Sequence, residues 1–148
     1  MKVISIKNND LYLREYIEIC NKEWGEYHSD LNKYIEDKLT SIKNNNEVIE
    51  VLGLINNNEM IGFISLFMED DNERIDLSPW YATMYVKEKY RGNNYSKILN
   101  DSLIEKAKEL GYKRIYLKSN LINYYEKFNA KYIETLNNGE KLFYIDLK

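Results

Sequence analysis

The segment from Met84 to Leu99 constrains the fold most, because it joins an apolar strand, a basic turn and the start of an amphipathic helix. Gly92 and Asn94 lie in the turn, and both residue types accept a left-handed backbone. Such a turn directs backbone N–H groups to one point, and the helix start adds partial positive charge there. The segment therefore predicts a phosphate or diphosphate site, with Arg91 as a fixed charge beside it.

Length and composition predict one folded domain over residues 1–148. The chain has 148 residues, of which 44% are hydrophobic and 14% aromatic, and this composition argues against disorder. No apolar run reaches the length of a membrane span, and the N-terminus lacks a signal-peptide pattern. Cys20 is the single cysteine, so it forms no internal disulfide, and we interpret it as a buried small hydrophobe. We therefore expect a cytoplasmic protein without a membrane partner.

The charge pattern speaks against nucleic-acid binding and against a metal site. The formal net charge is −3, whereas a nucleic-acid-binding surface needs a basic face. Lys87, Lys89, Arg91 and Lys97 surround the predicted phosphate turn, and a polyphosphate ligand accounts for them as well as a polymer would. One histidine and one cysteine cannot supply a set of nitrogen and sulfur ligands for a metal.

Hydrophobic periodicity predicts an α+β domain with the element order β-α-α-β-β-β-α-β-α-β-β, in which helices flank a mostly antiparallel central sheet. With six glycines and one proline in the chain, asparagine clusters take the turn positions between the periodic segments. The predicted strands cover residues 3–6, 48–55, 60–68, 80–86, 114–118, 131–136 and 142–147. The predicted helices cover residues 11–23, 31–42, 96–110 and 121–128.

The basic turn resembles the acyl-CoA diphosphate loop of the GNAT family of N-acetyltransferases. That loop reads Gln or Arg, two further residues, Gly, one residue and a small residue. Arg91 takes the first position, Asn94 stands in the place of the glycine, and Ser96, which also suits a helix cap, takes the final small position. The predicted element order is similar to the GNAT fold over nearly the whole chain. The resemblance implies acetyl-CoA as co-substrate, bound by Met84, Tyr85, Val86, Arg91, Gly92, Asn93, Asn94, Tyr95, Ser96, Lys97 and Asn120.

The strand over residues 80–86 begins after Pro79, which cannot donate to a sheet ladder and so should open the strand or lie at a bulge. In GNAT proteins this strand splays from its neighbour, and its freed backbone groups pair with the pantetheine arm. The resemblance places those contacts at Met84 to Val86, where one N–H would hold the thioester oxygen. Trp80 either packs in the core or lines the acceptor cleft.

A second segment, Tyr125-Glu126-Lys127-Phe128-Asn129, resembles the family's later Tyr-Glu-Lys-x-Gly motif. In the family, the tyrosine at the position of Tyr125 donates a proton to the departing CoA thiolate, which a phenol with an ordinary pKa of about 10 can do. Tyr124 is adjacent, so the register allows a shift by one residue. Asn129 takes the place of the glycine that ends the helix.

A general base is harder to identify from the sequence. A carboxylate acting through water would accept the proton of the amine, and our candidate is Asp76, with Glu69, Glu50 and Glu73 near the same strands. The acidic run that follows the third predicted strand either attracts a cationic amine or is a solvated loop. His28, the only histidine, is either a base, a specificity contact or an exposed loop residue.

The resemblance therefore predicts a GNAT-like N-acetyltransferase, in which a small-molecule or peptide amine attacks acetyl-CoA directly. A non-catalytic acyl-CoA-binding module is the main alternative, because the asparagines in glycine positions would weaken cofactor binding. An interaction domain without a cofactor is a third interpretation, and a DNA-binding regulator is disfavoured by charge. The exposed final strands would allow two chains to pair as a homodimer.

Overall fold

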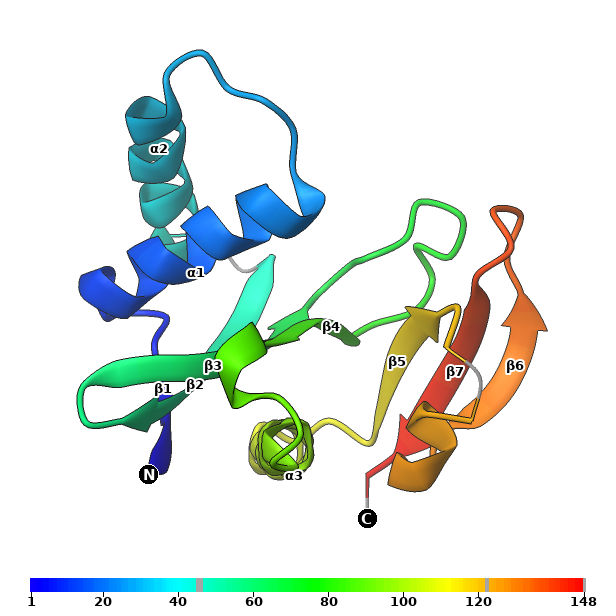
Figure 1. Cartoon of the computed structure of the whole chain (residues 1–148). Coiled ribbons are helices and arrows are strands. Elements are labelled where there is room, and N and C mark those ends of the chain that lie inside the picture. The colour runs from blue at the N-terminus through cyan, green and yellow to red at the C-terminus, as the bar shows by residue number, and fades with distance from the viewer. Residues whose placement is uncertain (45–46, 122, 148) are drawn as a thin grey trace.

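The computed structural model describes residues 1–44, 47–121 and 123–147, and it confirms the α+β architecture. Seven strands form one sheet in the order β1-β2-β3-β4-β5-β7-β6, with helices on both faces (Figure 1). No helix in these ranges is long and apolar enough to cross a bilayer. The strands are β1 (Lys2–Ser5), β2 (Val48–Asn56), β3 (Glu59–Phe67), β4 (Trp80–Val86), β5 (Arg114–Ser119), β6 (Lys131–Thr135) and β7 (Lys141–Asp146). The α-helices are α1 (Asp10–Trp24), α2 (Leu31–Asn44) and α3 (Tyr95–Glu109), and two short 3-10 turns are η1 (Glu88–Tyr90) and η2 (Tyr125–Phe128).

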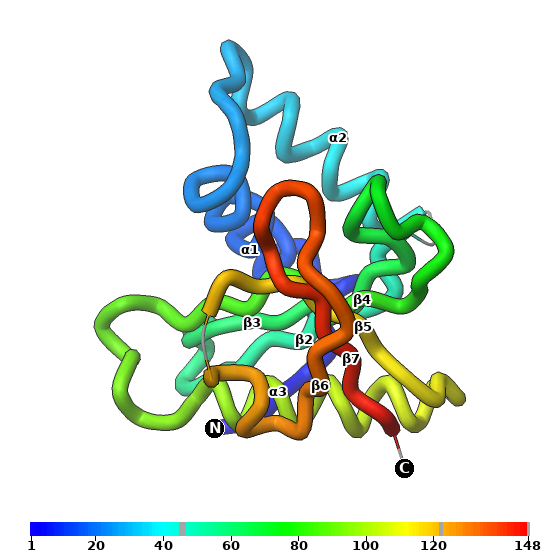
Figure 2. The backbone as a smooth tube through the Cα atoms, turned by 90° about the vertical axis from the view of Figure 1, so that its right-hand side faces the viewer, coloured from blue at the N-terminus to red at the C-terminus, as the bar shows by residue number. Residues whose placement is uncertain are grey.

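The two faces of the sheet carry separate cores because side chains alternate along each strand. Val51 packs with α1 and α2, whereas its neighbour Leu52 packs with α3 on the opposite face. Figures 1 and 2 both place α1 and α2 on one side of the sheet and α3 on the other. The core on the α3 side includes residues of β2, β3, β4, β5 and β7. Helix α3 therefore holds the two halves of the sheet together.

The central strand β4 is bonded along β3 but diverges from β5. Strands β4 and β5 run parallel, and their recorded pairing is Trp80 with Tyr116. On the other side, Ile64 pairs with Met84 and Ser65 with Ala82, so Thr83 is the extra residue of a β-bulge. The predicted splay is confirmed, and the bulge lies within the strand, at Thr83. Pro79 directly precedes β4, which confirms that it opens the strand.

Asparagines make the tight turns, as predicted. Asn57 and Asn58 have φ values of 52° and 63° between β2 and β3, so both central residues of the hairpin turn have positive φ. The helix predicted over residues 121–128 is wrong, because only the short 3-10 turn η2 forms there, and position 122 lies outside the described residues. Asn123 has φ 57° and Asn129 has φ 66°, and left-handed residues on both sides prevent a longer helix.

Candidate active site

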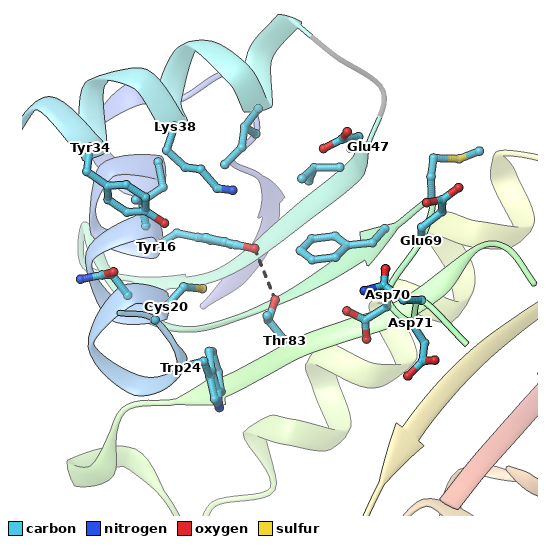
Figure 3. A pocket seen from close by; sticks show the side chains of 18 residues that line it. Tyr16, Cys20, Trp24, Tyr34, Lys38, Glu47, Glu69, Asp70, Asp71 and Thr83 are labelled. Atoms are coloured by element: carbon cyan, nitrogen blue, oxygen red, sulfur yellow. Dashed lines mark hydrogen bonds between the residues drawn. The ribbon is translucent and has the colours of Figure 1, made fainter. Parts of the chain in front are cut away.

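Two cavities open on either side of the β4 bulge. The first, of about 810 Å³, lies between α1, α2, the ends of β2 and β3 and the loop that follows β3 (Figure 3). The second, of about 380 Å³, lies between the end of β4 and the turn that starts α3. Trp24 lines both cavities, and the consecutive residues Thr83 and Met84 line the first and the second, respectively. The two cavities therefore approach each other at the point where β4 leaves β5.

The turn of the second cavity has the backbone that the sequence predicts. Asn94 is the N-cap of α3 with φ 61°, which confirms the left-handed conformation expected for a residue in a glycine position. Gly92 has φ +86°, and a Cβ there would meet nothing within 4 Å, so the sign of φ and not space favours glycine. Ser96 does not cap the helix but lies in its first turn. By helix geometry the N–H groups of Tyr95 and Ser96 have no acceptor within the helix, and both residues line the cavity. The Lys97 N–H, by contrast, donates to the Asn94 carbonyl oxygen at 3.2 Å.

The cations around this turn are not equally available. Lys87 Nζ lies 2.8 Å from a carboxylate oxygen of Glu15, Lys89 Nζ lies 3.2 Å from Glu59, and Lys97 Nζ lies 2.7 Å from Asp101.

Arg91, by contrast, has no carboxylate partner within the described ranges. Its Nε donates to the carbonyl oxygen of Val86 at 2.8 Å, and its guanidinium lies 5.4 Å from the centre of the Tyr85 ring. Of the four cations expected to surround a polyphosphate, Arg91 is therefore the one that no carboxylate neutralises within the described ranges.

The predicted cofactor residues divide between the cavity and its surroundings. Eight of the eleven line the second cavity, namely Met84, Tyr85, Val86, Arg91, Gly92, Asn94, Tyr95 and Ser96. Asn93, Lys97 and Asn120 are exposed and do not line it, and the Asn93 side chain instead donates to the Tyr90 carbonyl oxygen at 3.0 Å. The structure thus brings the strand and the turn together as a continuous groove.

The adjacent tyrosines of η2 occupy different environments. Tyr124 lines the second cavity, and the ammonium of Lys127 lies 4.4 Å from the centre of its ring. Tyr125 packs edge-on against Tyr81 at 5.6 Å and against Tyr124 at 4.8 Å between ring centres. Burial and the neighbouring Tyr124 raise the pKa of Tyr125 to about 12, so its phenol stays protonated at neutral pH.

A hydrogen-bonded set of hydroxyls connects the first cavity to the core. Tyr16 Oη lies 2.8 Å from Ser65 Oγ, and Ser65 Oγ lies 2.5 Å from Thr83 Oγ1. No local sequence pattern indicates this set, because the three residues lie far apart in the chain. Cys20 lines the same cavity and is only half-buried, and burial raises the pKa of its thiol to about 12. The thiol therefore stays protonated and is a poor nucleophile.

Asp76, predicted as a catalytic residue, is bound elsewhere. Its two carboxylate oxygens accept hydrogen bonds of 3.0 Å from Arg74 Nε and Nη2, and Arg74 also pairs with Glu134 of β6. The Arg74 guanidinium holds the pKa of Asp76 below its usual range. Asp76 is exposed and lines neither cavity. Through Arg74, Asp76 therefore links the loop between β3 and β4 to β6.

Two of the other carboxylates considered as bases also have structural partners. Glu50 is buried and accepts hydrogen bonds from Ser5 Oγ at 2.6 Å and from the Val51 N–H at 2.9 Å. Glu73 accepts a hydrogen bond from the Asn137 N–H at 3.0 Å. Neither residue lines either of the two cavities described above.

The other residues considered for the acceptor site, Trp80, His28 and Glu69, differ in burial and contacts. Trp80 is fully buried and its Nε1 donates to the Leu77 carbonyl oxygen at 2.9 Å, so it packs in the core and lines neither of the two cavities. His28 stacks on Tyr34 with ring centres 3.8 Å apart, and of the two only Tyr34 lines the first cavity. Glu69 is exposed and lines that cavity.

Comparison with known proteins identifies the fold and the family. The sequence model of the Acetyltransferase (GNAT) family matches residues 9–130. The chain belongs to the GNAT acetyltransferase family. No protein of curated function matches the sequence.

Solved structures share the fold over the full length of the chain. An aminoglycoside 6'-N-acetyltransferase complexed with coenzyme A has a TM-score of 0.74 at 16% identity, covering 100% of this chain and 98% of that chain. An N-acetyltransferase from Staphylococcus aureus Mu50 has a TM-score of 0.74 at 19% identity, with 100% of both chains covered. The PaiA N-acetyltransferase of Thermoplasma acidophilum, in complex with coenzyme A, has a TM-score of 0.66 at 20% identity, with 99% of both chains covered.

The family is one of acetyltransferases, and two of these similar structures are complexes with coenzyme A. The second cavity fits the diphosphate of coenzyme A, because the turn combines a left-handed Asn94, the first N–H groups of α3 and the uncompensated Arg91.

Proposed function

We propose that the protein transfers the acetyl group of acetyl-CoA to a primary amine, which attacks the thioester directly. The observation that supports this proposal is that two cavities approach each other at the β4 bulge and share Trp24 in their linings. One has the features of a diphosphate site, and the other is bounded by aromatic and acidic side chains. A reaction between a bound acyl donor and an amine needs both components at one point, and this arrangement provides it.

The acyl donor would lie along the free edge of β4. The carboxyl half of the strand pairs with β3 on one side and faces the gap to β5 on the other. Backbone groups of Met84 to Val86 are therefore in place to pair with the pantetheine amides. A strand N–H at the thioester would stabilise the oxyanion that forms during attack, which is worth roughly 3 kcal/mol per donor in well-studied sites.

The acceptor would enter the first cavity. Trp24 and Tyr34 supply aromatic surface, and Glu47, Glu69, Asp70 and Asp71 supply carboxylates. Such walls favour a cationic amine with an apolar body, either a small molecule or a peptide. Three of the similar structures are aminoglycoside acetyltransferases, which agrees with this class of acceptor without identifying it.

A tyrosine of η2 would protonate the leaving thiolate. By resemblance to the family we assign this role to Tyr125, and Tyr124 is the alternative because it lines the second cavity. Replacement of the true proton donor by phenylalanine should lower kcat by about 100-fold and leave acetyl-CoA affinity within twofold. The two variants, Tyr125→Phe and Tyr124→Phe, differ by one position, so each is the control of the other. Full turnover in both would refute a tyrosine acid.

Calorimetric titration with acetyl-CoA tests the donor site. Arg91→Ala removes charge-assisted hydrogen bonds, each worth about 1.5–3 kcal/mol, and should raise Kd by about 10- to 150-fold. Asn94→Ala should raise Kd as well, because alanine resists the left-handed backbone. Lys108→Ala is the matched control, since this ion-paired lysine lies at the far end of α3. If neither loop variant weakens binding, the diphosphate lies elsewhere.

A panel of amines then tests turnover, with peptide N-termini, lysine, polyamines, aminoglycosides and aromatic amines as acceptors. Release of free CoA that depends on one of these amines would support the enzyme. Tight acetyl-CoA binding without turnover of any acceptor would favour the non-catalytic acyl-CoA-binding module. The homodimer also stays a prediction, and the exposed edge strand β6 is the surface that sedimentation measurements would probe.

A further inference from the structure

The carboxylates of the first cavity are not equivalent. Asp71 Oδ2 binds Lys118 Nζ at 3.0 Å, and Asp71 Oδ1 accepts the N–H of Glu73 at 2.8 Å. Asp70 contacts the same lysine only through its backbone, whose carbonyl oxygen accepts from Lys118 Nζ at 2.6 Å. Within residues 1–44, 47–121 and 123–147, the Asp70 carboxylate has no hydrogen bond or ion pair.

The same lysine therefore sets the direction of both side chains. Figure 3 shows the Asp70 carboxylate pointing into the cavity, on the side of Thr83, and the Asp71 carboxylate pointing away from it toward β5. Because Lys118 holds Asp71 and the Asp70 backbone together, the Asp70 side chain is presented to the cavity by a fixed loop. It is half-buried, whereas Glu69 beside it is exposed.

We propose that Asp70 is the base that accepts the proton of the bound ammonium group, so that the amine becomes a nucleophile. This inference rests on the proposed function. Asp70 thus takes the place of Asp76 as the candidate base, because the Asp76 carboxylate is bound by Arg74 and lines neither cavity.

The charges around Asp70 are mixed. Lys118 of β5 favours the ionised carboxylate, whereas Asp71 of the same loop and Glu140 of the turn between β6 and β7 oppose it. Glu47, Glu69 and, from α2, Lys38 also line the cavity. Burial is the largest effect and raises the pKa of Asp70 to about 6. At neutral pH the group is then ionised but a stronger base than an ordinary aspartate.

The proton balance of the reaction is closed. Asp70 takes one proton from R–NH3+, which leaves the neutral amine with its lone pair. This nitrogen forms the C–N bond to the acetyl carbon, and the C–S bond breaks with both electrons on sulfur. The η2 tyrosine donates a proton to sulfur and regains one from the amide nitrogen. Asp70 releases its proton to water, so the products are the amide, CoA–SH and one proton.

The test measures kcat against pH for the wild type, Asp70→Asn, Asp70→Glu and Glu69→Gln, with the best acceptor of the amine panel. In the wild type, kcat should fall below about pH 6, as Asp70 becomes protonated. Asp70→Asn should lower kcat by about 100-fold or more at pH 7.5 and leave acetyl-CoA affinity unchanged. Asp70→Glu, which keeps a base, should recover part of that loss. Glu69→Gln removes the same charge from the same wall, and should affect KM while keeping the acid limb.

Thermal unfolding supplies a readout independent of the acceptor. The folded pKa of Asp70 lies above its unfolded value near 3.8, so the folded state loses stability as the pH rises through that interval. Asparagine has no charge to desolvate, so the Tm of Asp70→Asn relative to the wild type should increase from pH 4 to pH 7. An Asp70→Asn chain that fails to fold would contradict this expectation, and Asp70→Glu would then carry the kinetic test.

The outcomes separate the two proposals. An acid limb that disappears in Asp70→Asn, together with the kcat loss, would support Asp70 as the base. If the wild type turns over and the kcat of Asp70→Asn lies within threefold of the wild-type kcat, the assignment of Asp70 as the base is overturned and the proposed function stands. A loss of the same size in Glu69→Gln would overturn it too, because bulk charge would then explain both. No turnover with any amine would overturn the proposed function, and the role of Asp70 with it.

Discussion

Replacement of Gly62 by alanine should distort the second cavity, the proposed acyl-donor site, although Gly62 does not line that cavity. Gly62 lies on β3 opposite Val86 of β4. A Cβ at Gly62 would lie 2.5 Å from the Tyr85 carbonyl oxygen, 3.2 Å from the Val86 Cα and 3.2 Å from Leu99 Cδ1. Two of these three neighbours are backbone atoms of β4, so no side-chain rotation relieves the contact. The strand itself has to move.

The size of the effect follows from these contacts. An ordinary contact begins at 3.4 Å, so the Tyr85 carbonyl has to retreat from 2.5 Å to that distance. Overpacking of this kind costs about 1–3 kcal/mol, and the lower backbone entropy of unfolded alanine offsets roughly 0.5–1 kcal/mol of it. A net loss of about 1–2 kcal/mol corresponds to a fall in Tm of roughly 2–8 °C for a domain of this size. Since Tyr85 lines the second cavity, acetyl-CoA should also bind more weakly.

Gly53→Ala is the matched control. Gly53 lies on the neighbouring strand β2, and a Cβ there would meet only side chains, the nearest being Ile6 Cγ2 at 3.0 Å. Flexible side chains can shift, so we expect unfolding within about 0.5 kcal/mol of the wild type. Differential scanning calorimetry and acetyl-CoA titration of the two variants make the comparison. Equal stability and equal affinity in the two variants would refute the argument from the β3–β4 contact.

Three further predictions concern charge and packing. The loss of acetyl-CoA affinity in Arg91→Ala should shrink as salt is raised from 0.05 to 0.5 M (roughly a threefold shorter Debye length), which titration at each salt concentration would measure. Leu103→Ala should destabilise the fully buried α3 core by about 3–5 kcal/mol in urea unfolding, and a loss below 1 kcal/mol would contradict the described packing. Tyr16→Phe should cost about 1–2 kcal/mol because its hydroxyl bonds Ser65 and Thr83.

The order of the elements was predictable from the sequence because local signals agree with the tertiary structure. The strand over residues 80–86 was predicted at its observed bounds, and the turn at Asn94 was predicted from the tolerance of asparagine for positive φ. Each of these features depends on a few adjacent residues. The helix predicted over 121–128 failed because Asn123 interrupts it, and nothing local distinguishes a turn asparagine from a helical one.

The site was less predictable, because long-range contacts decide which polar groups are available. Asp70 and Asp76 belong to one acidic run of the sequence. In the folded chain, Arg74 binds the carboxylate of Asp76, whereas Lys118 binds the backbone of Asp70 and leaves its carboxylate facing the first cavity. In the same way, the pairing of Lys87 with Glu15 connects residues far apart in the chain. A sequence pattern shows that charges are present, whereas tertiary contacts determine which of them remain free.

The divergence of β4 from β5 has a consequence for the cohesion of the molecule. The sheet consists of two panels, β1-β2-β3-β4 and β5-β7-β6, and the backbone pairing recorded between them is Trp80 with Tyr116. Side-chain packing on α3 and around Trp80, and the contacts of the loop between β3 and β4, also join the panels. Acetyl-CoA bound in the gap between β4 and β5 would pair with β4 like an added strand and so connect the two panels. Amide hydrogen exchange along β4 and β5 should therefore slow on acetyl-CoA binding far more than exchange in the β2–β3 hairpin. Binding of the donor would therefore stabilise the junction between the two panels against local opening.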